Sequence, residues 1–168
     1  RKALQEIERQ TDIRGKPHDL AEAIMGLCQP QEERLLHLPW LSLEKLTGPL
    51  RPGQLWIVGA ATTLGKTTIL LQIALNATRS DKVVLFASGE EPIEDIGLRI
   101  AEMTEAINIM HLVHGAPDEA DQDGLVSASG WAALKHLWTP HISSLADLEH
   151  RYDLCVLEEQ KVDIVLVD

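Results

Sequence analysis

The fold is decided by one stretch, Leu55-Trp-Ile-Val-Gly-Ala-Ala-Thr-Thr-Leu-Gly-Lys-Thr-Thr68. Its first four residues are an apolar run of strand-forming side chains, which is typical of a parallel strand buried on both faces. Residues 59–65 then predict a loop, and from Lys66 to Thr78 apolar side chains recur on one side of a helix. A strand, a loop and a helix in this order place the loop at a helix N-terminus, where anions bind.

The loop carries the residue types that bind phosphate. Backbone N–H groups of such a loop face inward toward phosphate oxygens. Gly65 lets the backbone turn sharply, the Lys66 ammonium can reach the β and γ phosphates, and the Thr67 hydroxyl can hold Mg²⁺. The pattern usually has glycine where this chain has Ala60, so an ordinary strand–loop–helix is the alternative. The predicted nucleotide-binding residues are Ala60, Ala61, Thr62, Thr63, Leu64, Gly65, Lys66, Thr67 and Thr68.

Two acidic side chains follow two further apolar runs. In a parallel sheet, ligands gather at the C-terminal ends of the strands, so both acids are expected beside the phosphate loop. Glu90 is the candidate group that orients or deprotonates an attacking water. Asp168 is the candidate that holds the Mg²⁺ shell opposite Thr67. Glu91 and Glu94 are interpreted as first-turn residues that the dipole of the next helix favours.

The order of the remaining elements predicts an α/β fold with a parallel sheet flanked by helices. Apolar runs predict two more buried strands, and Ser144 begins a sequence typical of a helix N-cap. The glycine-, proline- and aspartate-rich segment 115–130 predicts a surface loop. The predicted elements are strands over 83–86 and 162–167 and helices over 92–103, 131–138 and 144–160.

Composition narrows the class of protein. The 168 residues carry a net charge of −11, of which residues 51–168 contribute −10. This charge argues against a basic nucleic-acid coat or a polybasic membrane patch within these residues. No apolar run approaches the roughly 20 residues of a membrane span. Cys28 and Cys155 are expected to be two buried thiols, with one disulfide as the alternative.

Several other side chains have a structural interpretation. His111 and His114 have a spacing that could bind a metal on a helix, but the sequence offers no third ligand, so they are read as a surface or core pair. Trp56 is expected in the core. The acids of Asp118–Asp123 are expected in a solvated loop. Arg99 is interpreted as a helix-surface residue that could face a subunit interface.

Together these motifs resemble the RecA-like ATPase superfamily and, within it, the hexameric DnaB-type replicative helicases. The resemblance covers roughly residues 38–168, and members of this family accept alanine at the position of Ala60. Ser88-Gly-Glu-Glu is also similar to the RadA/Sms and KaiC-like ATPases. The matching segments are Leu46–Leu55, Ser88–Glu90 followed by Arg99, His114-Gly115 with Trp131, His141-Ile142 as a short strand, and Val167-Asp168.

The resemblance implies an ATP-driven motor that moves on single-stranded DNA as a ring of identical subunits, expected to be a hexamer in the cytoplasm. ATP and Mg²⁺ are the implied cofactors, and a primase and a helicase loader are candidate partners. Lys66 and Glu90 are implied to be catalytic, with Thr67 and Asp168 at the metal, Asp168 through water. The alternatives are a RadA/Sms- or KaiC-like ATPase in recombination or signalling, or a non-hydrolysing loader or scaffold.

The resemblance also predicts the domain organisation. Residues 1–37 are expected to be a helical linker, and residues 38–168 a partial RecA-like ATPase domain that runs from the Walker A loop to the Walker B strand. The absence of an initial Met and the end on an apolar run predict a piece of a longer protein. The family places the arginine of the neighbouring subunit and the DNA-contacting loops after the metal-binding aspartate. The isolated chain is therefore expected to bind nucleotide weakly and to hydrolyse almost nothing.

Overall fold

The computed structural model describes residues 35–61, 64–105, 107–130, 134 and 136–168. The chain divides into two compact units, 1–35 and 36–168, and the description below concerns the second. The division at residue 37 into linker and ATPase domain stays a prediction. Four residues named above lie outside the described residues, namely Cys28, Thr62, Thr63 and Trp131, as do the helices expected before residue 35.

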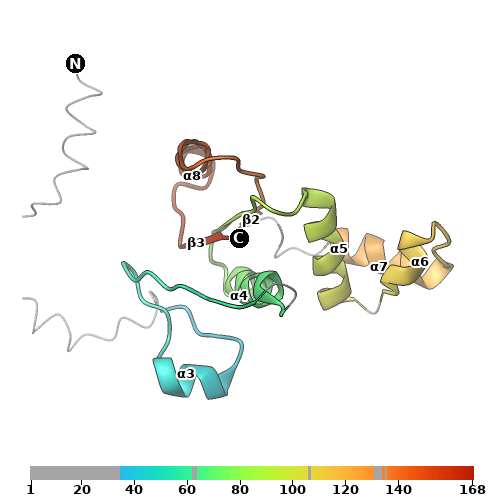
Figure 1. Ribbon diagram of the computed structural model, residues 1–168, viewed down its shortest axis with the longest axis horizontal. Helices are drawn as coiled ribbons and strands as arrows, with labels where there is room; N and C mark the ends of the chain where they lie inside the picture. The colour runs from blue at the N-terminus through green and yellow to red at the C-terminus, as the bar shows by residue number, and fades with distance from the viewer. Residues whose placement is uncertain (1–34, 62–63, 106, 131–133, 135) are drawn as a thin grey trace, which may run out of the picture. The chain divides into compact units, whose positions relative to one another are not determined.

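A parallel three-stranded sheet forms the centre of this unit, with β1 between β2 and β3. The whole of β1 is buried, because a strand pairs with each of its edges and a helix packs against each of its faces. The helix α4 lies on one face and α8 on the other (Figure 1). The predicted α/β fold with a parallel sheet is thus confirmed. The strands are β1 (Val84–Ala87), β2 (Leu137–Trp138) and β3 (Ile164–Val167).

The helices form where apolar side chains recur on one face. In α4, Leu71, Ala74 and Leu75 are buried against the sheet, and in α5 Ile96 and Ile100 are buried. These side chains pack with Phe86 and Leu166 into one core. The helices are α3 (Leu41–Thr47), α4 (Lys66–Arg79), α5 (Ile93–Thr104), α6 (Ile109–Val113), α7 (Glu119–Ser129) and α8 (Leu145–Glu159).

Helix α8 shows how the sequence sets an element boundary. The Ser144 hydroxyl accepts a hydrogen bond from the backbone N–H of Asp147, which satisfies one of the free donors of the first turn. The helix ends at Gln160, which adopts a left-handed conformation with φ 62°. The predicted start at Ser144 is therefore confirmed, and Cys155 in this helix is a buried free thiol as expected.

The predicted first strand over residues 55–58 is not formed, and this prediction is wrong. Leu55 and Ile57 are 86% and 88% exposed, and Trp56, expected in the core, is partly exposed as well. An apolar run becomes a buried strand only where neighbouring strands supply its hydrogen-bond partners. Among the described residues, no strand pairs with this segment, since β1 pairs with β2 and β3, and these two pair only with β1.

Three further predictions are corrected between residues 115 and 142. The segment read as a loop contains helix α7, whose N-terminus is held by a capping box between Asp118 and Asp121. Asp121 is 3% exposed, so it does not belong to a solvated loop. Leu137 and Trp138 form strand β2 rather than helix, because they pair with β1. The short strand expected at His141 is reduced to one bridge with Ser88.

No helix of the described residues is long and apolar enough to cross a membrane.

Candidate nucleotide-binding site

The phosphate loop ends in a left-handed glycine. Gly65 has φ 85°, a conformation that residues with a Cβ rarely adopt, and it is the N-cap of α4. The Gly65 carbonyl accepts a hydrogen bond from the backbone N–H of Ile69, so the helix starts at Lys66, as predicted. Lys66 and Thr67 are therefore the first two residues of the helix, where the N–H groups and the dipole favour an anion.

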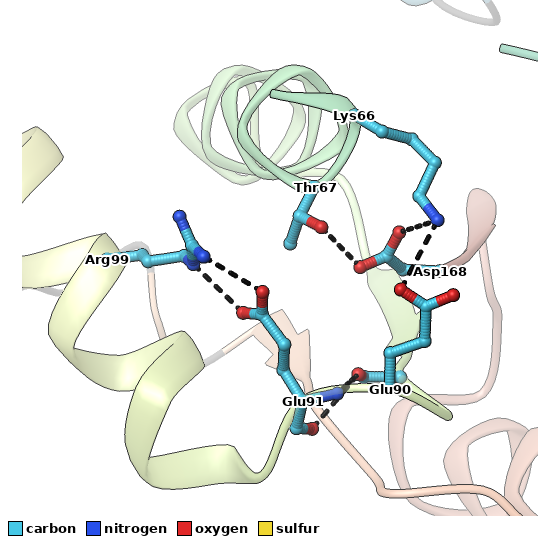
Figure 2. Close-up of polar contacts among 7 residues, drawn as sticks. Lys66, Thr67, Glu90, Glu91, Arg99 and Asp168 are labelled. Carbon is cyan, nitrogen blue, oxygen red and sulfur yellow. Dashed lines mark hydrogen bonds and ion pairs between the residues drawn. The ribbon is translucent and has the colours of Figure 1, made fainter. Parts of the chain in front are cut away.

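Asp168 joins this helix start to the end of β3. The Thr67 hydroxyl donates a hydrogen bond of 2.6 Å to Asp168 Oδ2, across 101 positions of the sequence. The Lys66 ammonium lies 3.1 Å from Asp168 Oδ1 (Figure 2). The Asp168 backbone N–H is bonded to the Ala87 carbonyl, which fixes the residue at the edge of the sheet. The pKa of Lys66 is raised, first by its hydrogen bond and charge interaction with Asp168 and then by Glu90.

The oxygen atoms of this pair fit a divalent cation. The Asp168 side chain is 0% exposed, yet its Oδ1 atom has no hydrogen-bond partner within the described residues, apart from the ion pair with Lys66. A buried carboxylate oxygen with a free lone pair, next to a threonine hydroxyl, offers the hard oxygen ligands that Mg²⁺ prefers. Thr67 and Asp168 are therefore the residues that could hold the metal.

Glu90 is a second, exposed carboxylate beside the Lys66 ammonium (Figure 2). Its Oε2 atom is 3.6 Å from Lys66 Nζ, and its side chain is 70% exposed. The neighbouring Gly89 N–H is bonded to the Asp168 carbonyl at 3.0 Å, which holds the loop after β1 against the end of β3. Glu90 thus faces solvent from a fixed backbone, within reach of a water molecule at the site.

Glu91 and Arg99 form a pair that sequence reasoning missed. Helix α5 begins at Ile93, and the Glu91 carboxylate accepts two hydrogen bonds of 2.9 Å from Arg99, from Nε and from Nη2 (Figure 2). Glu91 is therefore not simply a first-turn acid, and Arg99 is not simply a surface residue. Glu94, the other acid given that interpretation, does lie exposed in the first turn. A possible signal was the spacing, since Arg99 lies two turns into the helix that Glu91 precedes.

These residues surround one cavity of about 350 Å³. That volume is in the range of small-molecule sites. Asp168 is not a lining residue, but its buried carboxylate contacts Lys66 and Thr67, which are. Leu64, a predicted loop residue, is exposed and does not line the cavity. The lining residues are Ala60, Ala61, Gly65, Lys66, Thr67, Thr68, Glu90, Glu91 and Arg99.

A second polar cluster lies apart from this site, on α6 and α7. His111 Nδ1 is 2.7 Å from Asp121 Oδ2 and 3.8 Å from Asp118 Oδ2, so His111 has two acidic neighbours where the sequence offered no third ligand for His111 and His114. Asp121 also accepts hydrogen bonds from the backbone N–H groups of Asn108 and Asp118. These bonds occupy both of its oxygens and lower the pKa of Asp121. The cluster therefore joins two helices, and His114 is not part of it.

The fold and the site define a class of protein. The chain has a parallel sheet, a Gly-Lys-Thr loop at the start of α4, and an aspartate at the end of β3. These features define a phosphate-loop nucleotide-binding domain of the RecA-like type. The family model described as the DnaB-like helicase C terminal domain matches residues 37–168. The chain belongs to this family, and the resemblance drawn from its motifs is confirmed.

Similar curated proteins come from two groups. The DNA repair protein RadA of Listeria monocytogenes is 43% identical over 80 residues, which cover 47% of this chain and 17% of RadA. The replicative DNA helicase DnaB of Leifsonia xyli is 32% identical over 89 residues, covering 52% of this chain and 20% of DnaB. The replicative DNA helicase DnaB of Pasteurella multocida is 31% identical over 132 residues, which cover 76% of this chain and 28% of that protein. The chain thus spans less than a third of the length of these relatives.

Proposed function

We propose that this chain is the nucleotide-binding part of an ATP-dependent DNA helicase of the DnaB type. One observation carries the proposal: Asp168, about 100 positions away in the sequence, contacts both Lys66 and Thr67, and these two residues line one cavity together with Glu90. A lysine, a hydroxyl and a carboxylate in this arrangement supply the charges and ligands that phosphoryl transfer from a nucleoside triphosphate needs. The family and the DnaB relatives support the helicase assignment.

Each residue has a proposed role. The loop amides and the Lys66 ammonium bind the triphosphate, and Thr67 holds Mg²⁺ together with Asp168, the latter through water. When bound, the metal neutralises charge on the β and γ phosphate oxygens. Glu90 orients a water and accepts its proton during in-line attack on the γ phosphate. Its position supports this role, because the Glu90 carboxylate lines the cavity 3.6 Å from the Lys66 ammonium.

The proposed partners follow from the family rather than from a surface of this chain. We propose a cytoplasmic ring of identical subunits, expected to be a hexamer, in which a neighbour supplies an arginine to the transition state. Single-stranded DNA would be bound by regions outside these 168 residues, which agrees with the charge of −10 on residues 51–168. A primase and a helicase loader remain candidate partners.

A second candidate is a repair ATPase similar to RadA. The motif Ser88-Gly-Glu-Glu and the 43% identity to the Listeria protein favour it. The two candidates share the ATP site and differ in what hydrolysis drives. Unwinding of a forked duplex by the full-length protein, loaded on one single-stranded arm, supports the helicase. DNA-stimulated hydrolysis that promotes strand exchange without fork unwinding supports the RadA-like alternative.

The test of the site is Lys66→Ala in the full-length protein, with Lys45→Ala as the matched control. Lys45 is exposed in α3 and does not line the cavity. Loss of a charge-assisted contact to phosphate should weaken ATP binding by about 10- to 100-fold, whereas the control should bind normally. Fork unwinding should stop only in the Lys66 variant. Unchanged affinity and unwinding in Lys66→Ala would contradict the proposal and support a non-hydrolysing scaffold.

A further inference from the structure

The pair of Glu91 and Arg99 has no role in the function proposed so far, although both side chains line the cavity. The pair is bidentate, with two parallel hydrogen bonds of 2.9 Å. A fork of this kind fixes the plane of a guanidinium, which a single contact does not. Figure 2 shows the remaining guanidinium nitrogen of Arg99 directed away from Glu91. Its N–H groups can therefore donate to another acceptor.

The position of Glu91 is itself fixed from the core. The Ser88 hydroxyl accepts a hydrogen bond from the Glu91 backbone N–H and donates one to the Glu91 carbonyl, each 3.0 Å long. Ser88 is fully buried at the end of β1. A continuous set of hydrogen bonds thus runs from the buried strand end through Glu91 to the guanidinium of Arg99.

An arginine held in this way is suited to bind phosphate. Arg99 is 41% exposed, so a free side chain would sample many rotamers and lose that freedom when an anion binds. Glu91 orders the side chain in advance, which lowers the entropic cost of the later contact. The guanidinium lines the same cavity as Lys66 and Glu90, so it borders the space that the terminal phosphate of a bound triphosphate would enter.

We propose that Glu91 is a positioning residue that holds Arg99 for the terminal phosphate of a bound nucleoside triphosphate, so that the site distinguishes a triphosphate from a diphosphate. The inference rests on the proposed function. Glu91 is negatively charged and by itself disfavours an anion. The direction in which triphosphate affinity changes when this charge is removed therefore distinguishes two explanations. Preorganisation predicts weaker triphosphate binding when Glu91 is neutralised, whereas simple repulsion predicts tighter binding.

The experiment measures the Kd of ATP and of ADP with Mg²⁺ for the full-length protein, using a fluorescent nucleotide in competition. Glu91→Gln should weaken ATP binding about tenfold and ADP binding less than about twofold. Glu94→Gln is the matched control, because Glu94 is an exposed acid in the first turn of α5 and is not a cavity residue. It should leave both Kd values unchanged.

A double-mutant cycle separates positioning from a merely structural role. In an Arg99→Gln background, Glu91→Gln should change the ADP-to-ATP ratio of Kd values by less than about twofold, since the residue through which it acts is gone. If Glu91→Gln melts well below the wild type, Glu91→Asp serves instead. Aspartate keeps the charge, but its side chain is one methylene shorter and no longer brings the carboxylate to both guanidinium nitrogens, so the ratio should fall partway.

The outcomes distinguish the inference from the function on which it rests. ATP binding that does not depend on Lys66 overturns the proposed function and the inference together. If ATP binding does depend on Lys66, three results overturn the inference alone. These are that Glu91→Gln behaves like Glu94→Gln, that it lowers ATP and ADP affinity equally, or that it tightens ATP binding.

Discussion

Replacement of Gly65 by alanine tests whether the left-handed turn sets the phosphate site. Gly65 has φ +85°, and a Cβ added there would meet no atom closer than 3.8 Å, on Thr68. The cost of alanine is therefore backbone strain and not a steric clash. A left-handed conformation costs a residue with a Cβ about 1–2 kcal/mol. At roughly 2–4 °C per kcal/mol for a chain of this size, Gly65→Ala should lower the melting temperature by roughly 2–8 °C.

Gly97→Ala is the matched control for this change. Gly97 lies exposed within α5, has no positive φ, and a Cβ there would meet nothing within 4 Å. Alanine in such a helical position should stabilise the fold by about 0.5–1 kcal/mol. The same chemical substitution is thus predicted to shift stability in opposite directions at two positions.

The assays are thermal unfolding of the chain, monitored by circular dichroism, and the Kd of ATP with Mg²⁺. A relaxed turn at residue 65 moves the N–H groups of Lys66 and Thr67 away from the phosphate oxygens, so ATP affinity should fall about tenfold or more. Gly97→Ala should bind ATP normally. The reasoning is refuted if both variants shift the unfolding midpoint in the same direction, or if Gly65→Ala keeps wild-type affinity.

Three other predictions concern single side chains. Thr67→Val removes the hydroxyl bonded to Asp168, so more Mg²⁺ should be needed to saturate ATP binding; an unchanged Mg²⁺ titration would contradict the assignment. Hydrogen bonds hold the pKa of Asp121 below its ordinary value, so its charge stabilises the fold above about pH 4, and this contribution is lost as the pH falls through the lowered pKa. Asp121→Asn should therefore lose less stability than the wild type on acidification below about pH 4; equal losses in acid unfolding would argue against the lowered pKa. Burial raises the pKa of Cys155 to about 11, so in a Cys28→Ser variant iodoacetamide at pH 8 should label Cys155 only in urea; rapid native labelling would contradict its burial.

The sequence predicts those elements whose signals lie within the element itself. The one-sided apolar pattern of α4 and the Ser144 cap of α8 were sufficient to predict these two helices. The capping box of α7 was also readable, since Asp118 and Asp121 have the spacing of an N-cap and its third helical residue, but the Asp- and Gly-rich composition suggested a loop. Local hydrogen bonding decides that helix, and composition is a poorer guide to it.

The segment 55–58 could not be predicted in the same way. Its apolar composition indicates burial, but burial of a strand depends on partner strands that lie elsewhere in the chain. In the described residues Leu55 and Ile57 are exposed, and Val165 and Val167 of β3 are partly exposed too. Composition therefore predicts what a segment can bury, and only the sheet topology decides whether it is buried.

The residues of the candidate site also differ in whether the sequence could predict that they meet. Lys66, Thr67, Glu90 and Asp168 each stand at an end of a predicted element, so the rule that parallel strands gather ligands at one edge was enough to bring them together. Glu91 and Arg99 meet because of the direction in which α5 leaves the loop after β1. The spacing of the two residues is compatible with the pair but does not encode that direction, so the pair became visible only in the structure.

The two sides of the cavity differ in how much they depend on their surroundings. Thr67 and Lys66 are tied to a fully buried Asp168 carboxylate, so the side that would bind phosphate and metal is already formed. Glu90 is 70% exposed, and a carboxylate in bulk water is a poor base for a selected water molecule until solvent is excluded. We therefore expect nucleotide binding, although weak in the isolated chain, to depend on the side that is already formed, and hydrolysis to need a further surface that covers Glu90. This difference is the physical reason to expect that the chain binds ATP more readily than it hydrolyses it.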